Sequence, residues 1–109
     1  MSLEELKKLL ESTGLPVAYY AFPEEEAPGL PFICYKVAYS NNFSADGSVY
    51  KKINHIQIEL YTKHKDIESE EKVEEALSSF YWEKEEVYLE DENCFEVIYE
   101  LEVLDAKQS

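Results

Sequence analysis

The feature that most constrains the fold is a regular alternation of apolar and polar side chains between residues 53 and 61. The side chains of a strand alternate between the two faces of its sheet, so the pattern predicts a strand with one buried and one hydrated face. The buried face would hold Asn54, Ile56, Ile58 and Leu60, and the hydrated face His55, Gln57, Glu59 and Tyr61. Such a sheet is covered on one side and open on the other.

Two helices are expected to supply the covering layer. Ser2 and Glu5 form a capping-box pattern ahead of a run of leucines, which predicts a helix over 2–13 that Gly14 ends. Asp66 is a suitable N-cap for a second helix, which runs to about Ser79. Its predicted apolar stripe consists of Ile67, Val73, Ala76, Leu77 and Phe80, with glutamates, Glu70 among them, on the solvent side.

The remaining segments complete the predicted architecture. Strands are expected at 17–22, 32–39, 53–61 and 81–89, the last of them at a sheet edge because it carries so many charges. A final strand, with Phe95, Val97, Tyr99, Leu101 and Val103 facing the core, follows a turn at 90–93, and a frayed tail begins at about 105. Residues 1–109 therefore predict a single α+β domain in the order α-β-β-β-α-β-β. Its sheet is antiparallel, or mainly antiparallel, with about five strands and both helices packed on one face.

The charge is strongly acidic and unevenly distributed. The chain has 24 acidic residues against 10 basic ones, all lysine, and a formal net charge of −14. Residues 1–65 hold eight acids and seven lysines, whereas 66–109 hold sixteen acids and three lysines. Without arginine and with this charge, specific nucleic-acid binding is not expected. The acidic half can be a solvated surface, a surface that repels or imitates DNA, or a docking patch for a basic partner.

No motif predicts catalysis, a cofactor or a metal ion. His55 and His64 share no ligand spacing with each other or with the cysteines, and no phosphate-binding glycine motif occurs. Cys34 and Cys94 are expected to be reduced, buried thiols. The apolar runs are too short to span a membrane, and the N-terminus reads as a helix, not an export signal. The predictions are therefore no enzyme, no cofactor and no membrane partner, with synthesis inside the cell.

Two predicted loops, 23–31 and 40–51, are long for so small a domain. Both contain apolar residues that a solvated connection does not require. These residues either fold back onto the core or contact a neighbouring subunit, and the sequence leaves both open. The resulting subunit-interface candidates are Leu30, Phe43, Val49 and Tyr50.

Five segments that span nearly the whole chain carry a family likeness: LEELKKLLESTGLPVAYYAFPEEEAPGLPFICY, SNNFSADGSVYKK, INHIQIELYTKHKD, ESEEKVEEAL and CFEVIYELEVL. They resemble the small tail-completion, or tail-terminator, proteins of long-tailed phages and prophages of Gram-positive bacteria. None of these segments is a signature with a catalytic or ligand-binding role. The resemblance therefore transfers no catalytic residue.

The resemblance implies a structural protein that forms a ring, possibly a hexamer, at the head-proximal end of the tail tube. Its partners would be its own copies, the tail-tube protein and the head–tail connector, first in the bacterial cytoplasm and then in the virion. DNA would pass through the ring, where a carboxylate lining would repel its phosphates. The candidates for this lining are Glu83, Glu85, Glu86, Glu96, Glu100 and Glu102. The alternatives are an acidic DNA-mimic inhibitor and another head–tail adaptor.

Overall fold

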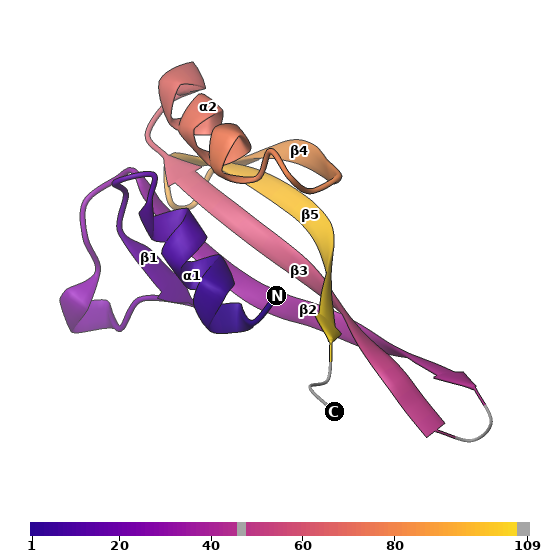
Figure 1. Cartoon of the computed structure of the whole chain (residues 1–109). Helices are drawn as coiled ribbons and strands as arrows, with labels where there is room; N and C mark the ends of the chain where they lie inside the picture. Colours follow the sequence, from indigo (N-terminus) through magenta and orange to yellow (C-terminus); the bar gives the residue numbers. More distant parts are fainter. Residues whose placement is uncertain (46–47, 107–109) are drawn as a thin grey trace.

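The structure is a computed structural model that describes the backbone of residues 1–45 and 48–106 and the side chains of 1–40 and 53–104. It contains a five-stranded sheet and two α-helices, which confirms the predicted α+β class (Figure 1). The elements in chain order are α1 (Leu3–Glu11), β1 (Val17–Tyr19), the 3-10 turn η1 (Glu24–Glu26), β2 (Phe32–Ala45), β3 (Ser48–Thr62), α2 (Ile67–Ala76), β4 (Trp82–Leu89) and β5 (Cys94–Ala106). The turn η1 is an addition to the predicted order.

The sheet is mixed, not wholly antiparallel. Its strand order is β1-β2-β3-β5-β4, with β1 parallel to β2 and every other neighbouring pair antiparallel. The parallel pair is possible because the proline-rich connection 20–31 is long enough to carry the chain back to the start of the sheet. The prediction that β4 is an edge strand is confirmed.

The predicted loop at 40–51 is wrong. β2 continues to Ala45 and β3 begins at Ser48, so the two strands form a long hairpin that projects beyond the helix-covered body (Figure 1). The polar residues in this stretch take strand conformation because each pairs with the opposite strand of the hairpin, for example Asn42 with Lys52. β5 likewise extends to Ala106, past the predicted start of the tail.

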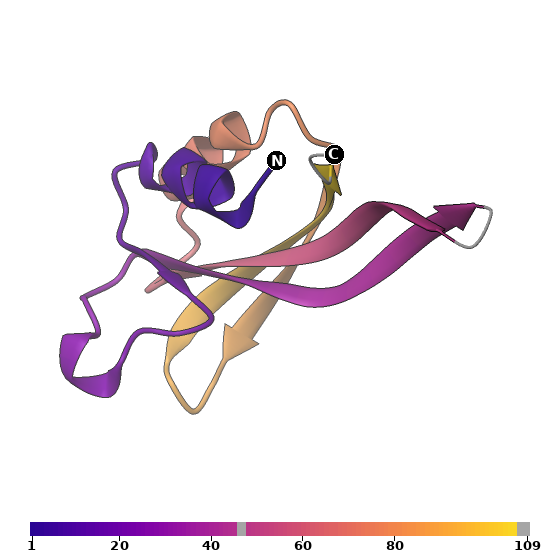
Figure 2. The ribbon, with the colours of Figure 1, turned by 60° about the horizontal axis from the view of Figure 1, so that its bottom comes forward.

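Both helices lie on the same face of the sheet, as Figure 2 shows. In α1, the Ser2 hydroxyl accepts from the Glu5 amide and the Glu5 carboxylate accepts from the Ser2 amide, so the predicted capping box is present. Gly14 has a φ of +85°, a value that favours glycine, and it follows the end of the helix as predicted. Asp66 caps α2 through the Ser69 amide and hydroxyl.

The hydrophobic core lies between the helices and the sheet. Its buried members are Leu6, Leu10, Ile33, Tyr35, Ile56, Ile58, Leu60, Val73, Leu77, Val97, Tyr99, Leu101 and Val103. The predicted stripe of α2 is correct at Val73 and Leu77, but Ile67 is 61% exposed and Glu70 is buried. The Asp66 cap places Glu70 against the sheet, where lysine partners compensate its charge.

Candidate functional site

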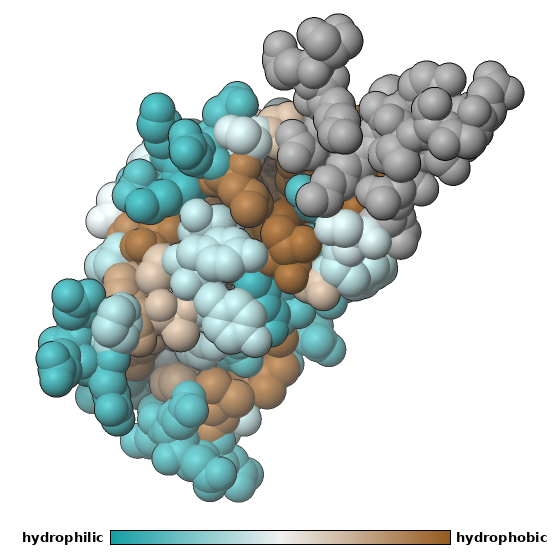
Figure 3. Space-filling view, turned by 90° about the horizontal axis from the view of Figure 1, so that it is seen from below, coloured by the Kyte–Doolittle hydropathy of each residue, from teal (hydrophilic) through white to brown (hydrophobic). Residues whose placement is uncertain are grey.

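The strand register brings most of the acidic candidates together on the helix-free face of the sheet, called here the open face. Glu83 on β4 lies opposite Glu100 on β5, which in turn lies opposite Gln57 on β3. Glu85 and Glu102 share this face, because strand positions two apart point to the same side. Figure 3 views the molecule from this side, where hydrophobic and hydrophilic residues are interleaved.

Glu86 does not belong to this face. It lies opposite the core residue Val97, on the side of the helices, and forms an ion pair with Lys65. Its assignment to an acidic lining is therefore wrong, because the alternation of β4 turns it away from Glu83 and Glu85. The adjacent glutamates at 85 and 86 could not be separated by composition, only by the strand register.

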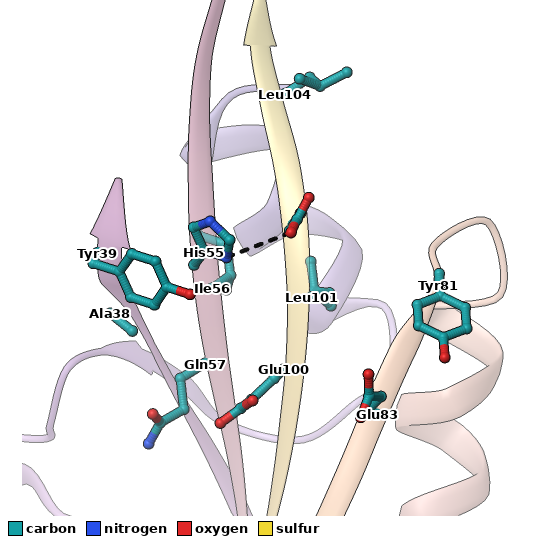
Figure 4. Close-up of a pocket in the computed structure, with 11 residues that line it drawn as sticks. Ala38, Tyr39, His55, Ile56, Gln57, Tyr81, Glu83, Glu100, Leu101 and Leu104 are labelled. Carbon is teal, nitrogen blue, oxygen red and sulfur yellow. Dashed lines mark ion pairs between the residues drawn. The ribbon is translucent and has the colours of Figure 1, made fainter. Parts of the chain in front are cut away.

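A cleft of about 600 Å³ opens on this face (Figure 4). His55 stacks on Tyr39 with ring centroids 4.0 Å apart, and its Nδ1 is 3.7 Å from the Glu102 carboxylate. Glu100 and Glu83 lie further along the cleft, whose lining also includes Tyr81, a residue that is 83% exposed. The cleft is thus lined by aromatic rings and carboxylates from four strands and the residue before β4.

Among the described side chains of the open face, glutamates outnumber lysines. Among the described side chains, no lysine forms an ion pair with its glutamates, and Glu83 and Glu100 are directly opposite each other. The one described lysine on the face, Lys36, lies over the Tyr20 ring at 5.2 Å. Like charges on directly opposed strand positions repel, so this arrangement does not serve stability.

The other end of the open face is covered. Phe22 reaches over from the connection after β1 and packs edge-to-face against Phe32, with centroids 5.3 Å apart. At this end Phe32 also packs against Tyr61, and Cys34 and Glu96 are buried, Glu96 with an exposed fraction of 7%. Glu96 is therefore on the predicted face but is buried, which contradicts its assignment to an exposed lining.

Burial raises the pKa of the ionisable groups at the covered end. Burial raises the pKa of Glu96, and the nearby Glu59 carboxylate adds to this against the hydrogen bond from Tyr61. Glu59 itself accepts hydrogen bonds from Tyr61 Oη at 3.3 Å and Gln57 Nε2 at 2.9 Å. Burial also raises the pKa of the Cys34 thiol to about 11, so it is not a reactive thiolate. Cys34 and Cys94 are free and buried, as predicted.

On the helix-covered side of the sheet, the carboxylates are paired with lysines. Glu70, 3% exposed, contacts Lys65 at 2.8 Å and Lys84 at 3.1 Å. Burial alone would raise the pKa of Glu70, but the hydrogen bonds from the two lysines outweigh burial and lower it. Glu74 accepts from Lys84 at 2.7 Å and from Tyr99 Oη at 2.9 Å. Sequence reasoning missed this lysine–carboxylate network, because Lys65 and Lys84 lie on different elements.

The remaining candidates do not converge on a chemical site. His64 is exposed in the connection before α2, whereas His55 lies in the cleft. Within residues 1–45 and 48–106, no cluster of histidine, cysteine and acidic side chains could hold a metal ion, and no helix is long and apolar enough to cross a membrane. Leu30, 39% exposed, lines a shallow hollow with Ile67. Phe43, Val49 and Tyr50 lie in the β2–β3 hairpin, and their side chains are outside the described residues.

Comparison with known proteins assigns no family: no family model matches the chain, and no curated sequence matches it.

Proposed function

We propose that this chain is a structural protein of a long-tailed phage or prophage that completes the tail tube and helps join the tail to the head connector. In this role it assembles as a ring, and the open face of each copy lines an acidic channel for DNA. The observation that supports the proposal best is the open face itself: a helix-free sheet surface whose exposed carboxylates have no lysine partner among the described side chains.

Electrostatics gives this surface a role in DNA passage. A protein surface that binds DNA needs several cationic side chains, which displace the counterions of the phosphates. The exposed charged side chains of the open face are mostly carboxylates, which do not bind phosphate in this way. At physiological ionic strength fields decay over about 8 Å, so repulsion acts only on DNA that comes near the wall. A channel lined in this way keeps DNA mobile. The lining consists of Glu83, Glu85, Glu100 and Glu102, without the paired Glu86 and the buried Glu96.

The partners of the proposed ring are further copies of this chain, the tail-tube protein and the connector. The β2–β3 hairpin, which projects from the body, is suited to contact a neighbouring copy (Figure 1). The same acidic surface also fits the alternative of a DNA-mimic inhibitor, which would instead compete with DNA for a basic enzyme.

The decisive experiment deletes the gene from its phage or prophage and images the particles by electron microscopy. Filled heads and unjoined or overlong tails are expected, and complementation restores joined virions. Normal, infectious virions without the chain would overturn the proposal. Inhibition of a restriction or CRISPR nuclease by the purified chain would favour the DNA mimic.

A second arm tests the lining. The quadruple variant E83Q, E85Q, E100Q and E102Q is expected to support joining but to slow DNA ejection, because the wall no longer repels phosphate. The matched control changes exposed glutamates of α2, E68Q, E71Q and E75Q, and leaves ejection unchanged. Equal ejection from both variants would remove the lining assignment.

A further inference from the structure

The outer edge of β2 is without a partner strand beyond β1. β1 pairs with β2 only over residues 33–35, and the Val37 amide then donates to Tyr19 Oη at 3.3 Å. Over residues 38–45, no strand of the described chain pairs with this edge. The segment, AYSNNFSA, contains neither a charged residue nor proline. Exposed edges are normally shielded by such residues, because unpaired amides and carbonyls attract other strands, so this edge is open to strand addition.

Ser40 and Asn42 present the outward hydrogen-bonding groups of this edge. In β2, alternate residues point their amide and carbonyl groups away from β3, and Val37 is one of them, since its amide reaches Tyr19. Ala38 has no register partner on β3, and this bulge shifts the alternation by one residue. The register is regular from there to residue 43, so the next outward positions are Ser40 and Asn42. An added strand would find its backbone partners there.

The 600 Å³ cleft of the open face begins at the same edge. Ala38 and Tyr39, the first residues beyond the region that β1 covers, line one end of it, and Tyr81 lines the other end (Figure 4). A strand that pairs with β2 would turn every second side chain towards the open face, beside Tyr39. In recognition by strand addition, the backbone supplies affinity and pockets for alternate side chains supply specificity. Edge and cleft together provide both.

The charge of the cleft favours a basic side chain. Its acidic lining residues are Glu83, Glu100 and Glu102, and no lysine is among the described residues that line it. A second copy of this chain is a poor source of a basic strand at its other sheet edge, because β4 carries three glutamates against one lysine. A cationic side chain that complements the cleft is therefore expected from a different protein.

The exposed ring of Tyr39 adds a second attraction for a cation. His55 stacks on one face of this ring with centroids 4.0 Å apart, yet Tyr39 is 58% exposed. An ammonium or guanidinium group is attracted to the face of an aromatic ring. The open face already contains one such contact, since Lys36 Nζ lies 5.2 Å from the centroid of the Tyr20 ring.

We infer that the free edge of β2, residues 38–45, binds an extended segment of a partner protein by strand addition, with basic side chains of that segment in the cleft. Ser40 and Asn42 hold the backbone of the segment, and Tyr39 and the cleft carboxylates hold its lysine or arginine side chains. This inference goes beyond the proposed function and does not require a ring. Within the proposed role, it states the chemistry by which a neighbouring protein is recognised.

The test titrates the full chain with the peptide acetyl-TKTKTKT-amide and follows the backbone amides by NMR. Changes in chemical shift are expected in residues 38–43 and around the cleft. The acidic peptide acetyl-TETETET-amide is expected to bind at least about tenfold more weakly, because it brings like charge to the cleft. A fully N-methylated lysine peptide keeps the charge but has no amide donor, and an equally large loss is expected.

Two variants separate the contributions of charge and ring. The double variant E100Q and E102Q, and the single variant Tyr39→Leu, are each expected to weaken binding of the lysine peptide about three- to tenfold. The matched control E68Q and E71Q removes the same charge from the exposed side of α2 and leaves binding unchanged.

Four results would overturn the inference. They are an absence of lysine-peptide binding at about 5 mM, equal binding of the acidic or the methylated peptide, an equal loss in the α2 control, and self-association through 38–45 that the peptide does not displace. The last result would assign the edge to a second copy. Each of these leaves the deletion phenotype of the proposed function untouched, and peptide binding by a chain whose deletion leaves virions normal would refute only the proposed function.

Discussion

The two faces of the sheet carry the same acidic residue type in opposite settings. On the helix-covered side, Glu70, Glu74 and Glu86 are all paired with Lys65 or Lys84. On the open face, Glu83 and Glu100 oppose each other with no lysine pair among the described side chains. Glu70 is buried, and its two lysines compensate a charge that would be very costly if it stood alone in the interior. Where a carboxylate is exposed, water screens it and repulsion is tolerated.

The formal net charge of −14 is therefore not distributed evenly over the surface of the protein. Lys65, Lys72 and Lys84 form ion pairs with residues of α2, and Lys65 also pairs with Glu86 of β4. On the open face, the exposed Glu83, Glu85 and Glu100 have no such lysine pair among the described side chains.

The largest effect on stability is expected from the lysine–carboxylate network on the helix-covered side. Lys84→Met keeps the aliphatic stem but removes a cation from the buried Glu70 and from Glu74, and should lower the free energy of unfolding by about 2 kcal/mol, since a buried carboxylate loses a partner. Urea unfolding measures it. The control Lys72→Met, which breaks the exposed pair with Glu68, should cost about 0.3 kcal/mol. An equal loss of unfolding free energy in the two variants would show that the buried lysine–carboxylate network stabilises the fold no more than an exposed ion pair does.

A smaller change in the free energy of unfolding, in this case a gain of stability, is expected from a substitution at the covered end of the open face. Because the pKa of Glu96 is raised in the folded state, wild-type stability from this group is fully present below the unfolded pKa near 4.5 and is lost as pH rises through the folded value. Glu96→Gln removes this loss and should stabilise the chain by about 1 kcal/mol at pH 7, with little gain at pH 4. Thermal unfolding between pH 4 and 8 measures the difference, and parallel curves for the two proteins would contradict it.

The smallest effect compares two positions on one strand. Glu83→Gln relieves repulsion with Glu100 and should stabilise by about 0.5 kcal/mol at low salt, a gain that about 1 M salt removes. Glu86→Gln, three residues later on the opposite face, should destabilise because it loses Lys65. Unfolding of both variants at two salt concentrations tests the pair. Shifts of the same sign would mean that the two faces do not differ electrostatically.

Much of the fold was predictable because it depends on local signals. Alternation fixed the two faces of β3, and the caps at Ser2 and Asp66 fixed the helix starts. The parallel pairing of β1 was not predictable, since it depends on where a proline-rich connection delivers the chain. The hairpin was missed because residues 40–45 are turn formers by propensity, and only their pairing with β3 makes them strand.

The candidate site was predictable by face but not by exposure. Alternation placed Glu96, Glu100 and Glu102 together, yet Glu96 is buried at the end of the face where Phe22, distant in sequence, packs against Phe32. Glu86 was misassigned because a run of charged residues hides its own alternation. The stacking of His55 on Tyr39 requires the pairing of β2 with β3, for which no sequence signal exists.

The short strand β1 has a consequence for any chain that joins the sheet. It occupies the first positions beside β2, and the Tyr19 hydroxyl takes the amide at Val37. An incoming strand therefore meets a barrier at this point and cannot slide further along. A slip of one residue would turn every side chain of the added strand to the opposite face, so a fixed stopping point at β1 would define the register of any strand that pairs beyond it.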